Sequence, residues 1–234
     1  MAEAEVASRT RALHALFGIL PLGAFVVAHL VVQGSALGGA DTYTRVMSAI
    51  DRIPFAGVVL LVFVVLPFAF HGLMGLVLTV RAIRNRDGEK IAPITWLDRG
   101  ASIAALLFVV FHLYRVGMRW LTQEDAAVVY SHVTESLSTT SKGVPWIALG
   151  YLVGVAATVV HLGIGTIRYR RTRALDENPR ASKRTMTAAM GACGFLLVLG
   201  TLTIMAFATG MRVFDAAKAP LGPCGSAMPA SSSK

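Results

Sequence analysis

The sequence contains little charge and little cysteine. Only 15% of its 234 residues are Asp, Glu, Lys or Arg, whereas soluble domains contain about 25%. The two cysteines, Cys193 and Cys224, have no second cysteine at a motif spacing, so we interpret both as incidental. Because the charges are confined to short clusters between long uncharged stretches, an ordinary water-soluble domain is excluded.

Hydrophobic sequence is abundant instead, at 55% of all residues. A helix needs about 20 apolar residues to span the hydrocarbon of a bilayer, and five segments meet this requirement: 12–34, 55–81, 99–121, 145–168 and 186–210. We therefore predict an all-α membrane protein with five transmembrane helices in one domain, residues 1–212, and a flexible Pro/Gly/Ser-rich tail, residues 213–234. The acidic residues in "MAEAEVASRTRA" argue against a signal peptide.

The distribution of Lys and Arg predicts the orientation in the membrane. With the N-terminus in the cytoplasm, 14 of the 22 basic residues fall on the cytoplasmic side and the other eight on the outside. Short loops rich in Lys and Arg stay cytoplasmic, so we expect a cytoplasmic N-terminus and an external C-terminus. The net charge of +9 reflects this topology, and no aromatic platform accompanies it for nucleic-acid binding.

Four of the six histidines lie inside predicted spans, one in each of the first four. At a rise of 1.5 Å per residue, His29 and His112 reach similar depths near the outer side of the membrane. His71 and His161 lie on the two descending helices, at a common depth roughly 10–15 Å nearer the cytoplasm. The sequence therefore predicts two layers, an outer pair and an inner pair.

Two facing imidazoles at one depth are typical of the axial ligands of a haem iron. The chain has no C-x-x-C-H motif, which excludes covalent c-type attachment. A single intramembrane histidine is as often an interhelical hydrogen-bond partner, but four at two matched depths favour ligation. Zinc or copper is disfavoured because neither pair has a Cys or carboxylate ligand nearby. We predict two haem b cofactors with all four histidines as iron ligands.

Arginines near the histidines are candidate partners for the anionic propionates of haem. Arg115 and Arg119 follow His112 by three and seven residues, on the same face of the helix, and Arg168 follows His161 by seven. We predict that Arg115 and Arg119 serve the outer haem and that Arg168 serves the inner one. The alternative is that these side chains are interfacial anchors that extend to the lipid headgroups.

The five spans, the one histidine in each of the first four, and the segments "LPFAFHGLMGL" and "VVHLGIGTIRY" resemble a known family. This family is the dihaem cytochrome b membrane anchors of succinate dehydrogenase and fumarate reductase, and the resemblance covers about residues 10–212. It implies that His71 and His161 hold the proximal haem and that His29 and His112 hold the distal haem. It also implies an iron–sulfur subunit and a flavoprotein subunit on the cytoplasmic face of a bacterial inner membrane. Succinate would be oxidised on another chain, and electrons would pass through the haems to a membrane quinone.

One position departs from the family pattern. Some fumarate reductases of this family have a glutamate two residues before the fourth-span histidine, on a proposed proton path, and Val159 occupies that position here. We also expect no acidic residue inside any span. Both features favour the succinate dehydrogenase direction, with menaquinone as the expected quinone.

The quinone site is predicted from polar residues near the edges of the two haems. On the outer side, His132, Asp51 and Tyr43 lie in connections that flank the distal haem, and on the inner side Trp96 lies at the entrance facing the iron–sulfur subunit. We predict these four as quinone-binding residues and assign no catalytic residue. His132 is alternatively an ordinary interfacial residue at a water boundary.

Two other functions are compatible with five spans. One is the dihaem cytochrome b of a hydrogenase or formate dehydrogenase, but those subunits often place two histidines on one helix, whereas this chain has one per helix. The other is a transporter or channel without a redox cofactor, which would need broken helices or paired charges inside the membrane. We find Pro67, whose missing donor predicts a kink just before His71, but no such charges.

Overall fold

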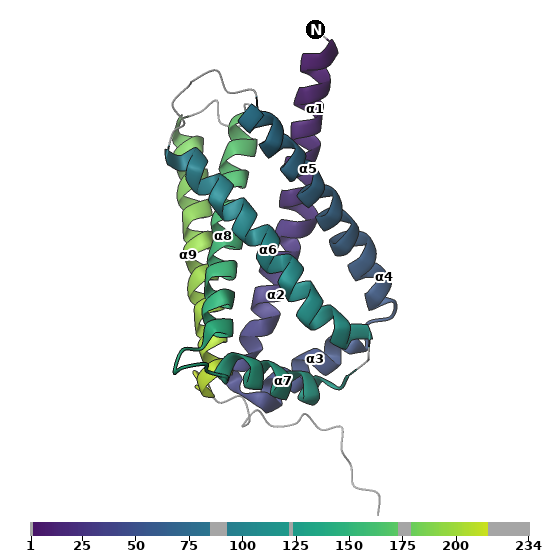
Figure 1. Ribbon diagram of the computed structural model, residues 1–234, viewed down its shortest axis with the longest axis vertical. Coiled ribbons are helices and arrows are strands. Elements are labelled where there is room, and N and C mark those ends of the chain that lie inside the picture. Colours follow the sequence, from purple (N-terminus) through teal and green to yellow (C-terminus); the bar gives the residue numbers. More distant parts are fainter. Residues whose placement is uncertain (1, 85–92, 122–123, 173–178, 215–234) are drawn as a thin grey trace, which may run out of the picture.

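Every named element of the protein is a helix in the computed structural model, which describes residues 2–84, 93–121, 124–172 and 179–214. Among these residues, five helical stretches are long and apolar enough to cross a membrane (Figure 1): Arg9–Gly38, Ala56–Arg84, Pro93–Val116, Trp146–Arg170 and Lys183–Thr209. The predicted fold class is therefore confirmed. The division into a domain and a tail stays a prediction, because residues 215–234 lie outside the described part of the chain.

The first span changes its helical pitch at a proline. α1 (Ala2–Phe17) leads into the π-helical turn η1 (Gly18–Gly23), which is followed by α2 (Ala24–Gln33) and the 3₁₀ turn η2 (Gly34–Gly38). Pro21 lies inside η1. Proline lacks an N–H and its ring crowds the preceding turn, so the regular α-helical hydrogen bonding is interrupted there.

The second span repeats this arrangement. α4 (Ala56–Leu60) leads into the π-helical turn η3 (Leu61–Val65), and α5 (Leu66–Arg84) completes the span. Pro67 lies two residues after η3, and its missing N–H would otherwise bond within that turn. The irregularity predicted from Pro67 is therefore present as a π-helical turn that ends six residues before His71.

The remaining three spans pack as a closer group. α8 (Trp146–Thr172) contacts both α6 (Pro93–Leu121) and α9 (Pro179–Thr209), whereas α5 packs against α1. Figure 1 shows α4 and α5 diverging from α8 and α9, with α6 crossing obliquely between them. This arrangement leaves the four histidine-bearing spans around a common interior.

Two short helices that the sequence analysis treats as connections cover one end of the bundle. They are α3 (Ala40–Asp51) and α7 (Ala126–Ser138), and they lie across the end opposite the N-terminus (Figure 1). At 12 and 13 residues they are too short to span a membrane. Tyr43 of α3 is buried against Tyr130 of α7 and Phe207 of α9. These aromatic contacts fix the cap to the bundle.

The outer surface of the spans is apolar. Large hydrophobic side chains on all five spans are exposed, among them Leu20, Phe63, Leu107, Val153 and Phe195, each with 60–66% of its surface exposed. A patch of this extent on a soluble protein would cause association, whereas a bilayer solvates it. The surface therefore agrees with five lipid-facing helices.

Candidate functional site

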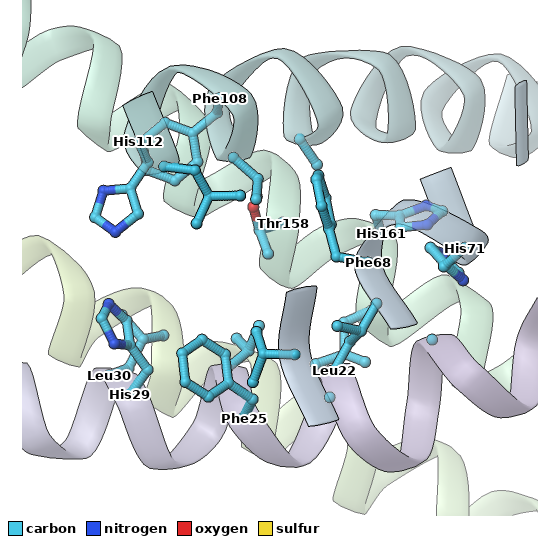
Figure 2. Close-up of a pocket in the computed structure, with 18 of the residues that line it drawn as sticks. Leu22, Phe25, His29, Leu30, Phe68, His71, Phe108, His112, Thr158 and His161 are labelled. Atoms are coloured by element: carbon cyan, nitrogen blue, oxygen red, sulfur yellow. The ribbon is translucent and has the colours of Figure 1, made fainter. Parts of the chain in front are cut away.

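A large apolar cavity runs through the interior between the histidine-bearing spans. It encloses about 2110 Å³, roughly twice the upper end of the volume range of an ordinary ligand pocket. Figure 2 shows a histidine pair toward each of two ends of this space, with Leu22, Phe25 and Phe68 among the side chains between them. The cavity is therefore large enough for two bulky, flat ligands.

The end of the cavity covered by α3 and α7, named the outer end after the predicted orientation, contains His29 of α2 and His112 of α6, and the opposite end is named the inner end. Their ring centroids are 5.8 Å apart, with the rings at 75° to one another. Phe25 stacks on His29 at 5.3 Å, and Phe108 stacks on His112 at 5.7 Å. The two phenyl rings pack against the imidazoles and restrict their orientations.

The inner end contains His71 of α5 and His161 of α8, with ring centroids 6.0 Å apart and an angle of 62° between the rings. His14 of α1 adds a third imidazole, which stacks on His71 at 4.0 Å with only 9° between the planes. The structure thus brings together the two pairs that helix depth selects, and their role as iron ligands stays a prediction. No pattern in the sequence predicts the stacking of His14 on His71.

Three of the four paired histidines use Nδ1 for a hydrogen bond. The Nδ1–H of His71 donates to the backbone carbonyl oxygen of His14 at 2.9 Å, and that of His161 donates to Asp98 Oδ1 at 3.2 Å. Nδ1 of His112 shares a hydrogen bond with the Tyr151 hydroxyl at 3.3 Å. Metal-ligating histidines typically engage their second nitrogen in this way, which leaves Nε2 for the metal.

These pairs fit the donor set of haem iron. Among the described residues, no three His, Cys, Asp or Glu side chains approach closely enough to hold a metal ion by themselves. Each end instead offers two opposed imidazoles, which is the axial pair that an iron already bound by a porphyrin requires. Nitrogens bound about 2 Å from a metal on opposite sides lie about 4 Å apart, and ring centroids separated by 5.8 and 6.0 Å are compatible with that spacing.

The expectation that no acidic residue lies inside a span is wrong for Asp98. The third span begins at Pro93 rather than at residue 99, and the Asp98 carboxylate contacts His161 and forms an ion pair with Arg168. When the start of a span is placed next to a charged residue, a carboxylate inside the span is left out. Asp98 is such a carboxylate, because its charge is neutralised by partners on another helix. Val159 occupies the position of the family glutamate. Its uncharged side chain is fully buried.

The predicted propionate partners lie in different environments. Arg115 donates from Nη2 to Ser136 Oγ of α7 at 2.7 Å, and Arg168 pairs with Asp98. The side chain of Arg119 lies outside the described part of the structure. Arg99, which the sequence analysis counts only as a cytoplasmic-side charge, lines the cavity, and its Nη1 is buried without a hydrogen-bond partner among the described contacts. An unsatisfied buried cation at the cavity wall suits an anionic group of a ligand.

Two of the four predicted quinone residues line the cavity. Tyr43 and Asp51 do so at the end covered by α3, where the Tyr43 hydroxyl donates to Gln33 Oε1 at 3.4 Å. Burial raises the pKa of Tyr43 to about 12, so its phenol keeps its proton to a higher pH than a free tyrosine does.

The other two predicted quinone residues are not among the described lining residues. His132 lies one contact away from the cavity, because its Nδ1 is 3.3 Å from Oε2 of the lining residue Glu124. Trp96 is 56% exposed, and its ring lies 5.9 Å from the guanidinium carbon of Arg99. The structure therefore joins His132 to the outer end and places Trp96 near the inner wall.

The chain is similar in sequence to a known cytochrome subunit. The chain is 28% identical over 200 residues to the succinate dehydrogenase cytochrome b558 subunit of Bacillus subtilis, a match that covers 84% of this chain and 95% of that protein. No family model matches, and no solved structure matches. The similarity confirms the resemblance found in the sequence to succinate dehydrogenase cytochrome b subunits.

Proposed function

We propose that this relative of a succinate dehydrogenase cytochrome b subunit is the dihaem membrane anchor of a succinate:quinone oxidoreductase. The observation that carries the proposal is the arrangement of four imidazoles from four spans, two by two, in one apolar cavity. Ionisable residues inside a membrane are rare and are functional candidates by default, and here one lies on each of four separate spans. Similarity over 84% of the chain to a cytochrome b subunit supports the same conclusion.

The proposed roles of the residues follow from their positions. His29 and His112 hold the outer haem, and His71 and His161 hold the inner haem. When bound, the haems supply one-electron transfer between the iron–sulfur subunit and the quinone. The proposed propionate partners are arginines near the two pairs, namely Arg115 and Arg119 for the outer haem and Arg168, together with Arg99, for the inner haem.

The proposed partners are an iron–sulfur subunit and a flavoprotein subunit, which carries the dicarboxylate chemistry. They bind the face at which Arg84 ends α5 and Arg9 lies in α1, because the basic residues there mark the cytoplasmic side. This places the chain in a bacterial inner membrane with its N-terminus in the cytoplasm and its C-terminus outside. Reporter domains fused to each terminus test the orientation, and an external N-terminus would contradict it.

The proposed electron acceptor is a quinone, with menaquinone favoured, bound at the outer end of the cavity. Tyr43 provides a buried phenol that is hydrogen-bonded to Gln33, and Asp51 provides a carboxylate on the same helix. His132 supports this outer quinone site through its contact with the cavity-lining residue Glu124. Trp96 is proposed to contact quinone at a separate entrance, at the inner end. We expect Asp51→Asn and His132→Ala to lose quinone reduction while retaining both haems. Unchanged activity in both variants would remove the outer site.

The whole proposal is tested by purifying the chain with its bound proteins from native membranes. We expect a reduced α-band of b-type haem, about two haems per chain, and co-purification of a flavoprotein and an iron–sulfur protein. A colourless chain would support the transporter alternative instead. A haem-containing chain that co-purifies with a hydrogenase or formate dehydrogenase would identify the other cytochrome class.

A further inference from the structure

We propose that Asp98 is a positioning residue for His161 and that it lowers the reduction potential of the inner haem, with Arg168 moderating its effect. This inference rests on the proposed dihaem function, because it assigns a role toward one of the two haem sites. It concerns a carboxylate that no motif in the sequence identifies. Its basis is the set of contacts that Asp98 makes at the inner end of the cavity.

Asp98 joins two helices through both of its oxygens. It lies on α6, and Oδ1 accepts a hydrogen bond from His161 Nδ1 on α8 at 3.2 Å. Oδ2 accepts from Nη1 of Arg168, which also lies on α8, seven residues after His161. The Asp98 side chain is only 13% exposed, compared with 27% for His161 and 46% for Arg168. The carboxylate is therefore held between a ligand histidine and a cation.

This contact fixes the tautomer of His161. A carboxylate accepts and does not donate, so the proton of the neutral imidazole lies on Nδ1 and the lone pair on Nε2. Histidines that bind metals through one nitrogen are commonly oriented by a carboxylate at the other, which also raises their basicity. Greater electron donation from Nε2 stabilises the ferric state more than the ferrous state. Asp98 therefore lowers the potential of the haem that His161 ligates.

Two of the other paired histidines have neutral, weaker partners at Nδ1. His71 donates to a neutral backbone carbonyl, and His112 shares its hydrogen bond with a neutral hydroxyl. Among the described contacts, Asp98 is the one carboxylate that hydrogen bonds to any of the four. Hydrogen bonds to an ionised partner are roughly twice as strong as those between neutral groups. The effect of Asp98 is therefore confined to the inner haem.

Arg168 sets the strength of this effect through its ion pair. With Arg168 present, part of the negative charge of Asp98 is neutralised, and the carboxylate is held in place toward His161. Removing the cation exposes the full carboxylate charge to His161 and to the iron that it ligates. Asp98→Asn and Arg168→Gln are therefore expected to shift the inner potential in opposite directions, which a general disturbance of packing would not do.

The test is a potentiometric titration of both haems in the intact complex. The inner haem is identified as the one lost in His71→Ala. We expect Asp98→Asn to shift the inner reduction equilibrium toward the ferrous state about tenfold, which is about 59 mV upward for one electron. Arg168→Gln should shift it downward, and Asp125→Asn, a cavity-lining carboxylate at the other end, should leave it unchanged. The electron paramagnetic resonance signal of the inner haem should change in Asp98→Asn, since the neutral amide is a weaker acceptor for His161 Nδ1 than the carboxylate.

The outcomes separate this inference from the proposed function. If the wild-type complex contains two b haems and Asp98→Asn leaves the inner potential and resonance signal unchanged, the role of Asp98 is refuted and the dihaem function stands. If the wild-type complex contains no bis-histidine haem, the function itself fails.

Two further results keep the inference decidable. If Asp98→Asn does not accumulate, Arg168→Gln decides, because an unchanged or raised inner potential would overturn the proposal. When Asp98→Asn and Arg168→Gln are combined, the downward shift of the inner potential caused by Arg168→Gln should disappear. A shift from Arg168→Gln that persists without Asp98 would show that Arg168 acts on the haem directly.

Discussion

Gly18 provides the sharpest test of the inner site, because its missing side chain makes room for His71. A Cβ atom at Gly18 would lie 2.4 Å from Cε1 and 2.8 Å from Nδ1 of the His71 ring. Ordinary van der Waals contact begins at 3.4 Å, so in Gly18→Ala the ring must move by 3.4 minus 2.4, or 1.0 Å. A metal ligand tolerates a displacement of about 0.2 Å. The required movement is about five times larger.

The surroundings limit how His71 can accommodate this movement. His14 stacks on its ring at 4.0 Å, and the hydrogen bond from Nδ1 to the His14 carbonyl is already 2.9 Å long. Moving the ring breaks that bond or displaces Nε2 from the inner site. We therefore expect Gly18→Ala to lose the inner haem and to retain the outer one, so that haem content falls from about two per chain to about one.

The assay is haem per polypeptide, measured from the reduced spectrum of the purified protein, with the resonance signals of the two haems recorded separately. Gly150→Ala is the matched control, since a Cβ at Gly150 on α8 meets nothing within 4 Å. Alanine favours a helix over glycine by about 1 kcal/mol, so a weakened helix cannot explain a loss. Two haems with unchanged signals in Gly18→Ala would refute the reasoning.

Two further predictions concern the outer end. Because burial raises the pKa of Tyr43 from 10.0 to about 12, the folded state retains a proton that the unfolded state loses above pH 10. Stability should therefore decrease by about 3 kcal/mol as the pH rises from 10 to 12, as measured by thermal unfolding in detergent, and Tyr43→Phe should lack this decrease. Arg115→Ala removes the proposed propionate partner, and a charged hydrogen bond of about 2 kcal/mol corresponds to roughly thirtyfold weaker haem retention. Transfer of haem to an apoprotein acceptor measures this, and unchanged transfer would return Arg115 to a structural role with Ser136.

The spans and the histidine pairing could be predicted because both depend on local geometry. Apolar length identifies a transmembrane helix, and a constant rise per residue converts sequence position into depth. His29 with His112, and His71 with His161, follow from this arithmetic without knowledge of the packing. The π-helical turns at Pro21 and Pro67 change the pitch only locally and do not disturb the pairing.

The rest of the site depends on contacts between helices that periodicity does not encode. Asp98 reaches His161 because α6 and α8 pack side by side, 63 residues apart in the sequence. The stack of His14 on His71 depends on the packing of α1 on α5. The helices α3 and α7 are too short and too polar to register as spans. Of these features, only Asp98 has a signal in the sequence, namely a charged residue next to the predicted start of a span.

The haem content of four single variants, His29→Ala, His71→Ala, His112→Ala and His161→Ala, tests the central claim most directly. His132→Ala is the control, since this histidine pairs with Glu124 rather than with another imidazole. We expect each of the four variants to keep one haem. The haem that remains should have the same spectrum in His29→Ala and His112→Ala, and the other haem should remain, with its own spectrum, in both His71→Ala and His161→Ala. Retention of both haems in the two members of either pair would contradict the account.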